Sequence, residues 1–214
     1  VAGNIQSDYT ADVVRGAAPD DLDPLERARL RQTILQRPNA DETLATISDT
    51  ELDLALHLSR PLDGTLVPTV TGLLLIGRES ALEKFLPSHE VAIQVTRAGT
   101  PGINEHARKP ILAALERLEA LYALQPTEPG EVSFGMQRFT IPLVDIDAFR
   151  EAVLNAFAHR EFRALGPVLI NWASSSLEVT NPGGFVSGIT VKSLLSAPPS
   201  PRNPPLVDVL QRLG

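Results

Sequence analysis

The sequence predicts an α/β protein, of the α+β kind, that is built as two lobes. Residues 90–97 alternate apolar and polar side chains, which is the period of a half-buried strand. Residues 106–124 repeat apolar side chains at three-to-four spacing, which is the period of an amphipathic helix. Residues 166–172 and 176–180 read as two short strands around a polar turn, so we expect a hairpin there.

Composition bounds the function of the chain. Apolar residues make up 43% and charged residues 21% of the 214 positions, as in ordinary globular proteins. The absence of cysteine excludes a disulfide framework, a thiolate zinc site and a thiol nucleophile. No apolar run approaches the ~18 residues of a membrane span, so we expect a cytoplasmic protein without membrane contact.

The net charge of −7 argues against a surface that coats a polyanion. Residues 1–60 carry eleven acids against six arginines, so a DNA-binding surface is not expected in that part.

The first third of the chain predicts short elements. Residues 7–16 alternate weakly and could form one strand. Pro24 opens a helix with Asp23 as its cap, and Ser48 or Asp49 caps a second helix. Two short helices in this order can form a helix-turn-helix motif. We do not expect DNA reading, because the acids at the start of the second helix would repel phosphate.

The middle of the chain leaves one ambiguity. Residues 66–77 are apolar and fit a buried strand or a short helix equally well. Residues 131–141 alternate and predict a strand with a bulge at Gly135. Prolines and glycine within 126–142 indicate a domain boundary in that stretch.

The last third predicts a helix, the hairpin and a further helix. Asp145 or Asp147 caps the first helix, and the Asn-Pro-Gly-Gly sequence at 181–184 ends the second strand of the hairpin. Five prolines within 198–205 predict an extended loop. Asn203 is expected to cap the final helix.

Glu, Asn and His recur at a spacing of four in the helix pattern that spans 150–162. Glu151, Asn155 and His159 are spaced by four, and each step of four advances about 40° around a helix axis, so they form one stripe. A solvated face with an accidental Asn is the alternative interpretation. A carboxylate and an amide oxygen on one face can, however, hold a hydrated Mg²⁺ that is shared with phosphates.

The bend after the hairpin supplies a second set of candidate residues. The side chain of Asn181 ends the strand and can accept a hydrogen bond from the exocyclic amine of adenine. Gly183 and Gly184 permit close approach of the backbone to a ligand. The helix stripe and this bend together predict a nucleotide site.

These motifs resemble known proteins. EAVLNAFAH resembles the N-box of the GHKL ATPases, and LEVTNPGG stands where their first glycine box would stand. FREAVLNAFAHREF, LEVTNPGGF and SPRNPPLVDVLQRLG, in this order, resemble bacterial proteins described as RecG-related ATP-dependent DNA helicases or as transcriptional regulators. In those proteins a Schlafen AlbA-type DNA-binding domain precedes a GHKL-like C-terminal ATPase domain.

The resemblance implies a role for each candidate residue. Glu151 would be the catalytic acid that positions water, Asn155 the Mg²⁺ ligand, and Asn181 the adenine-reading residue. Asn replaces the Asp of the family at position 181, and Asn-Pro-Gly-Gly differs from Asp-x-Gly-x-Gly in spacing. The residues expected to bind ATP with Mg²⁺ are Glu151, Asn155, His159, Asn181, Gly183 and Gly184.

The resemblance also implies a domain division and a function. Residues 1–130 would be the tail and connector of the AlbA-type DNA-binding region, and residues 131–214 a partial GHKL-like α/β sandwich that binds nucleotide. The second glycine box would follow Gly214, so we expect the chain to be a fragment. The leading interpretation is a fragment of a transcriptional regulator that contacts DNA through the full-length protein.

Two alternatives remain open. The chain could be part of a working Mg²⁺-dependent ATPase, or a structural module that forms homodimers and has a dead nucleotide site. Helicase activity is not expected, because the chain has no GxxxxGK[ST] phosphate loop.

Other polar residues are expected in structural roles. Trp172 should pack in the core, and Arg160 and Arg163 should lie at a solvated helix end. Three histidines lack metal-ligand spacing and are expected at the surface or in caps: His57, His89 and His106.

Overall fold

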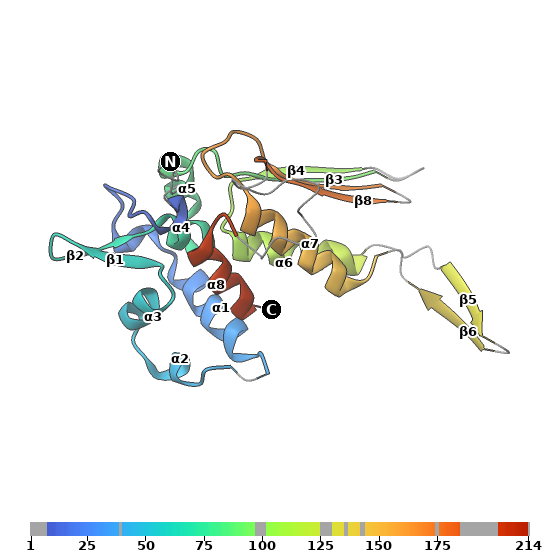
Figure 1. The fold of residues 1–214 in the computed structure, drawn as a ribbon, viewed down its shortest axis with the longest axis horizontal. Coiled ribbons are helices and arrows are strands. Elements are labelled where there is room, and N and C mark those ends of the chain that lie inside the picture. Colours follow the sequence, from blue (N-terminus) through green and yellow to red (C-terminus); the bar gives the residue numbers. More distant parts are fainter. Residues whose placement is uncertain are drawn as a thin grey trace, which may run out of the picture.

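The computed structural model describes residues 8–38, 40–96, 102–124, 130–134, 137–141, 144–173, 176–184 and 201–213. Figure 1 shows a sheet with two helices beneath it, and a group of shorter helices at one end of these layers. The predicted mixture of helices and strands is confirmed.

The main sheet has four strands in the order β4-β3-β7-β8. β3 and β7 pair in parallel, and the two outer pairs are antiparallel. Alternate residues of the central strands are deeply buried, so one face of the sheet is part of the core. The strands are β3 (Val91–Val95), β4 (Ile103–Ala107), β7 (Val168–Trp172) and β8 (Leu177–Thr180).

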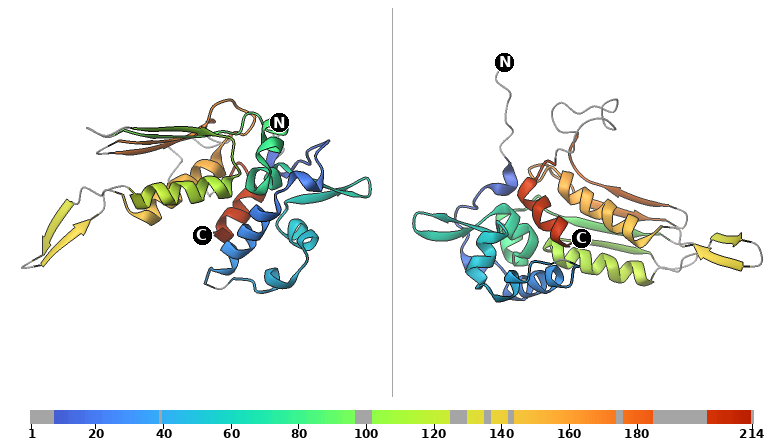
Figure 2. Two further views of the ribbon diagram at one scale, coloured as in Figure 1. Left: turned by 180° about the vertical axis from the view of Figure 1, so that it is seen from behind. Right: turned by 60° about the horizontal axis from the view of Figure 1, so that its bottom comes forward.

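Two long helices, α6 (Ile111–Leu124) and α7 (Ile146–His159), lie side by side against one face of this sheet (Figures 1 and 2). An aromatic cluster joins the layers. Tyr122 of α6, Phe149 of α7 and Trp172 of β7 have ring centroids 5.4–5.8 Å apart, a spacing that favours aromatic packing. Trp172 therefore packs in the core, as predicted.

At one end of these layers, α8 (Pro204–Leu213) lies between α7 and α1 (Pro24–Leu35) and also contacts η1 (Tyr9–Ala11). α4 (Val70–Ile76) is buried along its whole length beside α1 and α6. The buried apolar residues of all these elements form one continuous cluster.

The remaining elements are short. Figure 1 shows that one hairpin projects beside the short helices and the other projects beyond the far end of α6 and α7. They are η2 (Pro19–Asp21), α2 (Thr43–Thr46), α3 (Asp49–Ala55), α5 (Glu79–Phe85), the hairpin β1 (Ser59–Leu62) with β2 (Thr65–Pro68), and the hairpin β5 (Gly130–Phe134) with β6 (Gln137–Ile141).

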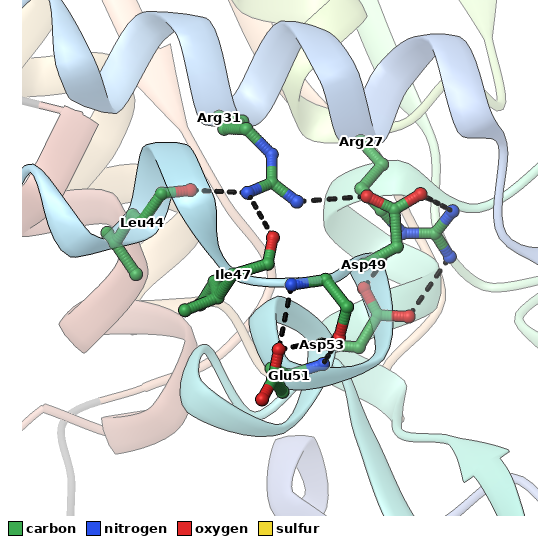
Figure 3. Close-up of polar contacts among 8 residues, drawn as sticks. Arg27, Arg31, Leu44, Ile47, Asp49, Glu51 and Asp53 are labelled. Carbon is green, nitrogen blue, oxygen red and sulfur yellow. Dashed lines mark hydrogen bonds and ion pairs between the residues drawn. The ribbon is translucent and has the colours of Figure 1, made fainter.

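Arginines of α1 hold α3 in place (Figure 3). Arg27 donates to both carboxylate oxygens of Asp53, at 2.8 and 3.0 Å, and both side chains are buried. Burial raises the pKa of Asp53, and the hydrogen bonds from Arg27 oppose that rise. Arg31 pairs with Asp49 and donates to the carbonyls of Leu44 and Ile47. These arginines are therefore occupied by acids and carbonyls rather than presented to DNA.

Several predicted boundaries were wrong. Residues 9–11 form a 3-10 turn, which Asp8 caps by accepting from Thr10 N, rather than part of a strand. The ambiguous apolar stretch at 66–77 contains the end of β2 and then α4, which Thr69 caps. His106 belongs to strand β4 and not to the following helix.

The predicted strand with a bulge at Gly135 is instead two strands, β5 and β6, paired as a hairpin in which Phe134 opposes Gln137. Gly135 itself lies outside the described residues.

Candidate functional site

Helix α7 carries the predicted stripe. It begins after Asp145, whose carboxylate accepts from the backbone N–H groups of Asp147 and Ala148 at 2.9 and 3.3 Å, as predicted for a cap. Phe149, Val153 and the residues in register with them bury one face of the helix against the core. The stripe consequently lies on the opposite face.

Glu151, Asn155 and His159 are all exposed. The side-chain amide of Asn155 donates from Nδ2 to Glu151 Oε1 at 2.8 Å. This bond leaves the Asn155 Oδ1 atom available as an acceptor or a metal ligand. Each step of four residues rotates the stripe by about 40°, so it turns from the outermost face at Glu151 toward the flank of the helix at His159.

The bend at 181–184 lies against the end of α7. β8 runs antiparallel to β7, and Thr180 pairs with Leu169 near the start of β7. The backbone N–H of Glu161, two residues after His159, donates to the carbonyl of Pro182 at 2.8 Å. The bend therefore lies beside the C-terminal end of the helix, close in sequence to the last member of the stripe.

The two glycines of the bend differ in their surroundings. Gly183 has a φ of +124°, and a Cβ there would lie 3.1 Å from Glu161 Cβ and 3.3 Å from Glu161 N. Both the positive φ and this tight contact favour glycine at this position. Among the described residues, no atom lies within 4 Å of the place that a Cβ at Gly184 would occupy. Asn181 is half-buried, and its Nδ2 donates to Pro182 O at 3.4 Å.

The predicted residues are thus spread along the helix rather than gathered at one point. His159 is the member of the stripe nearest to the bend. Glu151 lies eight residues earlier, which is about 12 Å along the axis at 1.5 Å per residue.

A polar junction that the sequence did not predict connects this end of α7 to the start of α8. Arg202 donates from Nη1 to Glu161 Oε2 and from Nη2 to the carbonyl of Gly184, both at 2.7 Å. Asn203 donates from Nδ2 to the carbonyls of Ala158 and Arg160, at 3.0 and 2.9 Å. The carbonyl of Asn203 accepts the first helical bond of α8, so Asn203 occupies the predicted cap position, while its side chain also caps the end of α7. The Pro-rich sequence around Arg202 and Asn203 was the one sequence feature that could have indicated this junction.

Arg160 is fully buried, which corrects its predicted place at a solvated helix end. Its Nη2 donates to the carbonyls of Ser88 and Gly166, at 2.6 and 2.7 Å, and its guanidinium lies over the ring of Phe162. Burial lowers the pKa of Arg160 to about 10. Arg160 therefore anchors the end of α7 to the loops before β3 and β7 and cannot meet a phosphate at the surface.

His89 is likewise fully buried, so its predicted surface or capping role is wrong. Its Nε2 lies 2.8 Å from the carbonyl of Lys109, and burial lowers its pKa to about 4. His57 and His106 are exposed, and His106 Nδ1 lies 2.8 Å from Glu90 Oε1.

The described residues contain no cluster of three or more acidic or histidine side chains that could hold a metal ion. A cavity of about 360 Å³ lies on the other flank of α7, where Arg150 and Leu154 line it together with residues of α1 and α6. It includes none of the predicted site residues. Within the described part of the chain, no helix has the length and apolar character needed to cross a membrane.

The fold and the bend together define a mixed α/β protein with a glycine-containing bend at the end of an edge strand. Residues 166–214 match the family described as "Putative ATP-dependent DNA helicase recG C-terminal". This match includes Asn181, Gly183 and Gly184, but the stripe on α7 precedes it. Residues 2–92 match a domain of unknown function, DUF8451, and neither match is to a Schlafen AlbA-type domain.

Among solved structures, the chain is similar to the DIP2311 protein from Corynebacterium diphtheriae, with 27% sequence identity and a TM-score of 0.69. The similarity covers 96% of this chain and 39% of that protein, so the chain spans well under half the length of this relative. A search of curated proteins found no match.

Proposed function

We propose that this chain contributes the adenine-facing part of a regulatory ATP site in a DNA-binding transcriptional regulator of the bacterial cytoplasm. Asn181, Gly183 and Gly184 would receive the base. Glu151, Asn155 and His159 would line the path of the phosphates along α7. The longer protein would contact DNA outside the described N-terminal part, and it can form homodimers.

The bend packed against the end of α7 is the observation that carries this proposal. It supports a nucleotide site because the exposed glycines of the bend lie beside the end of the helix that carries the exposed polar stripe. The match of residues 166–214 to the RecG C-terminal family supports the same reading. Asn181 supplies an amide oxygen in place of a carboxylate, so it can accept from an adenine amine without a charge.

The metal requirement follows from the ligands present. Asn155 offers one neutral oxygen and Glu151 one carboxylate, which is too few for an all-protein cage. Mg²⁺ commonly keeps several waters and binds through few carboxylates together with substrate phosphates. We therefore expect Mg²⁺ to bind only with a nucleotide, through Asn155 Oδ1 once the nucleotide is in place.

Titration calorimetry of this chain tests the proposal. ATP with Mg²⁺, and ADP alone, should both release heat with the unaltered chain, and Asn181→Ala should weaken both. Asn104→Ala is the matched control, because Asn104 is exposed on β4 at the opposite edge of the sheet. The absence of saturable heat with either nucleotide would overturn the proposal.

Hydrolysis is a second candidate activity, favoured by the contact between Glu151 and Asn155. A carboxylate next to a metal-binding amide can orient an attacking water. If the longer protein turns over ATP, Glu151→Ala should abolish phosphate release while nucleotide binding persists. Equal rates in the variant and the unaltered protein would exclude Glu151 as the catalytic acid.

A further inference from the structure

We infer that Arg202 and Glu161 are positioning residues that hold the 181–184 bend in shape for the adenine half of a nucleotide. The inference rests on the proposed function, and it adds two residues that neither the N-box nor the glycine-box resemblance assigns.

The first support is the geometry of the Arg202 side chain. Its two terminal nitrogens are both engaged, one by the Glu161 carboxylate and one by the Gly184 carbonyl, each at 2.7 Å. The Arg202 side chain is only 13% exposed and that of Glu161 22% exposed. Hydrogen bonds in which donor or acceptor is charged are short and strong, and little exposure limits screening of this pair by water.

The second support is that Glu161 holds the bend from another side. Its backbone N–H donates to Pro182 O, and its Cβ lies 3.1 Å from the place that a Cβ on Gly183 would occupy. Hydrogen bonds therefore hold the bend at Pro182 and Gly184, and Glu161 packs closely against Gly183 between them. Gly183 and Gly184 are nonetheless exposed among the described residues, so their backbone can meet a ligand.

The third support is the anchorage of Arg202 itself. Its neighbour Asn203 is 2% exposed and bonds the last carbonyls of α7. The backbone from which the Arg202 side chain extends is therefore held in place, and the guanidinium reaches the bend from a fixed position. Because the bend is already held in shape, nucleotide binding costs less conformational entropy than it would if the bend were a free loop.

Arg202 could instead bind phosphate directly, and two ligands separate these roles. A phosphate ligand would affect ADP and leave adenosine unchanged. A positioning residue would affect both equally, because the bend would contact the base that they share.

The test uses this chain with Arg202→Gln, which removes the charge and cannot span both acceptors. Affinities for ADP and for adenosine are measured by calorimetry, and backbone hydrogen exchange at 181–184 is measured without ligand. Arg202→Lys, which keeps the charge, and Glu161→Gln, which keeps an acceptor, are milder second variants. Arg212→Gln is the matched control, because Arg212 lies in α8, the helix that follows Arg202, in an exposed pair with Asp208.

We expect Arg202→Gln to weaken ADP and adenosine alike by about tenfold, the loss of one strong hydrogen bond's contribution. Exchange at 181–184 should speed up by a similar factor, the milder variants should show smaller changes in the same direction, and Arg212→Gln should match the unaltered chain.

Unchanged exchange and unchanged affinities in Arg202→Gln would overturn the inference while leaving the nucleotide site standing. A loss confined to ADP would also overturn it, in favour of a phosphate ligand. Failure of the unaltered chain to bind either ligand would overturn the proposed function, and the inference with it.

Discussion

Replacing Asn203 with alanine should destabilise the protein more than its small size suggests. The Asn203 amide is 2% exposed and donates to the carbonyls of Ala158 and Arg160 within 3.0 Å. These carbonyls belong to the last turn of α7, where the helix leaves its acceptors without internal partners. Alanine cannot donate to them, and the site is too buried for water to replace the amide freely.

The magnitude follows from two well-formed bonds. Each contributes about 0.5–1.5 kcal/mol net, and a buried acceptor left without a partner costs about 1–3 kcal/mol. We expect Asn203→Ala to lower the free energy of unfolding by about 2–3 kcal/mol. For a chain of this length that corresponds to a fall in Tm of about 4–12 °C.

Urea and thermal unfolding followed by circular dichroism measure this change. Asn155→Ala is the control, because the same substitution there removes an exposed bond within α7. Alanine is the better helix former by about 0.5 kcal/mol, so this control should be neutral or slightly stabilising. If Asn203→Ala unfolds within 0.5 kcal/mol of the unaltered chain, on the scale of ordinary surface substitutions, the capping role of Asn203 is refuted.

Three further predictions concern buried polar groups and the bend. Burial holds the pKa of His89 at about 4 in the folded chain, so as pH falls the unfolded chain takes up a proton on this side chain before the folded chain does. The free energy of unfolding should therefore fall by up to about 3 kcal/mol as pH drops from 6.5 to 4. His89→Gln should flatten the pH dependence of stability in this range, and an unchanged pH dependence would contradict the prediction. Arg27→Met should lower the free energy of unfolding in urea by about 3 kcal/mol, because it leaves the buried Asp53 carboxylate without its partner. The double variant with Asp53→Leu should recover most of this stability. If the losses from the two substitutions were additive, the Arg27–Asp53 pairing would be excluded. Gly183→Ala should lower the free energy of unfolding, measured by thermal unfolding, by about 1–3 kcal/mol, and Gly184→Ala by less than about 0.5 kcal/mol. Only Gly183 has a positive φ, and only there would a Cβ crowd Glu161. Equal effects of the two substitutions would be inconsistent with the bend described.

Local signals in the sequence predicted local structure well. Caps at Asp23, Ser48 and Asp145 were confirmed, because a cap depends on a few neighbouring residues and their own backbone. The hairpin of β7 and β8 was also confirmed, because its two strands are separated only by a short turn. The stripe on α7 was found for the same reason, since helical spacing alone places its members on one face.

What the sequence missed depends on partners far along the chain. β4 is a short edge strand, and a helix pattern that begins just after it hid the strand. Arg160 is followed by charged residues that suggest solvent, yet its acceptor at Ser88 lies 72 positions earlier. His89 similarly reaches the carbonyl of Lys109 across β3 and β4. No local pattern encodes which distant carbonyl a buried donor will meet.

The placement of α8 gives the proposed site a connection to the rest of the molecule. α8 starts at the junction where Arg202 holds the bend, and it contacts α7 on one side and α1 and η1 on the other. Leu206, Val209 and Leu210 bury it in the same apolar cluster that includes α1.

If the bend binds a nucleotide, ordering it should favour the docked position of α8, because Arg202 would have to release Gly184 for α8 to move. By thermodynamic linkage, releasing α8 from α1 should weaken nucleotide binding by the same factor by which the bound nucleotide strengthens the docking of α8 on α1. The region that matches the RecG C-terminal family and the region that matches DUF8451 would then communicate through one helix, and a regulator that reads a nucleotide in one part to alter another needs such a connection.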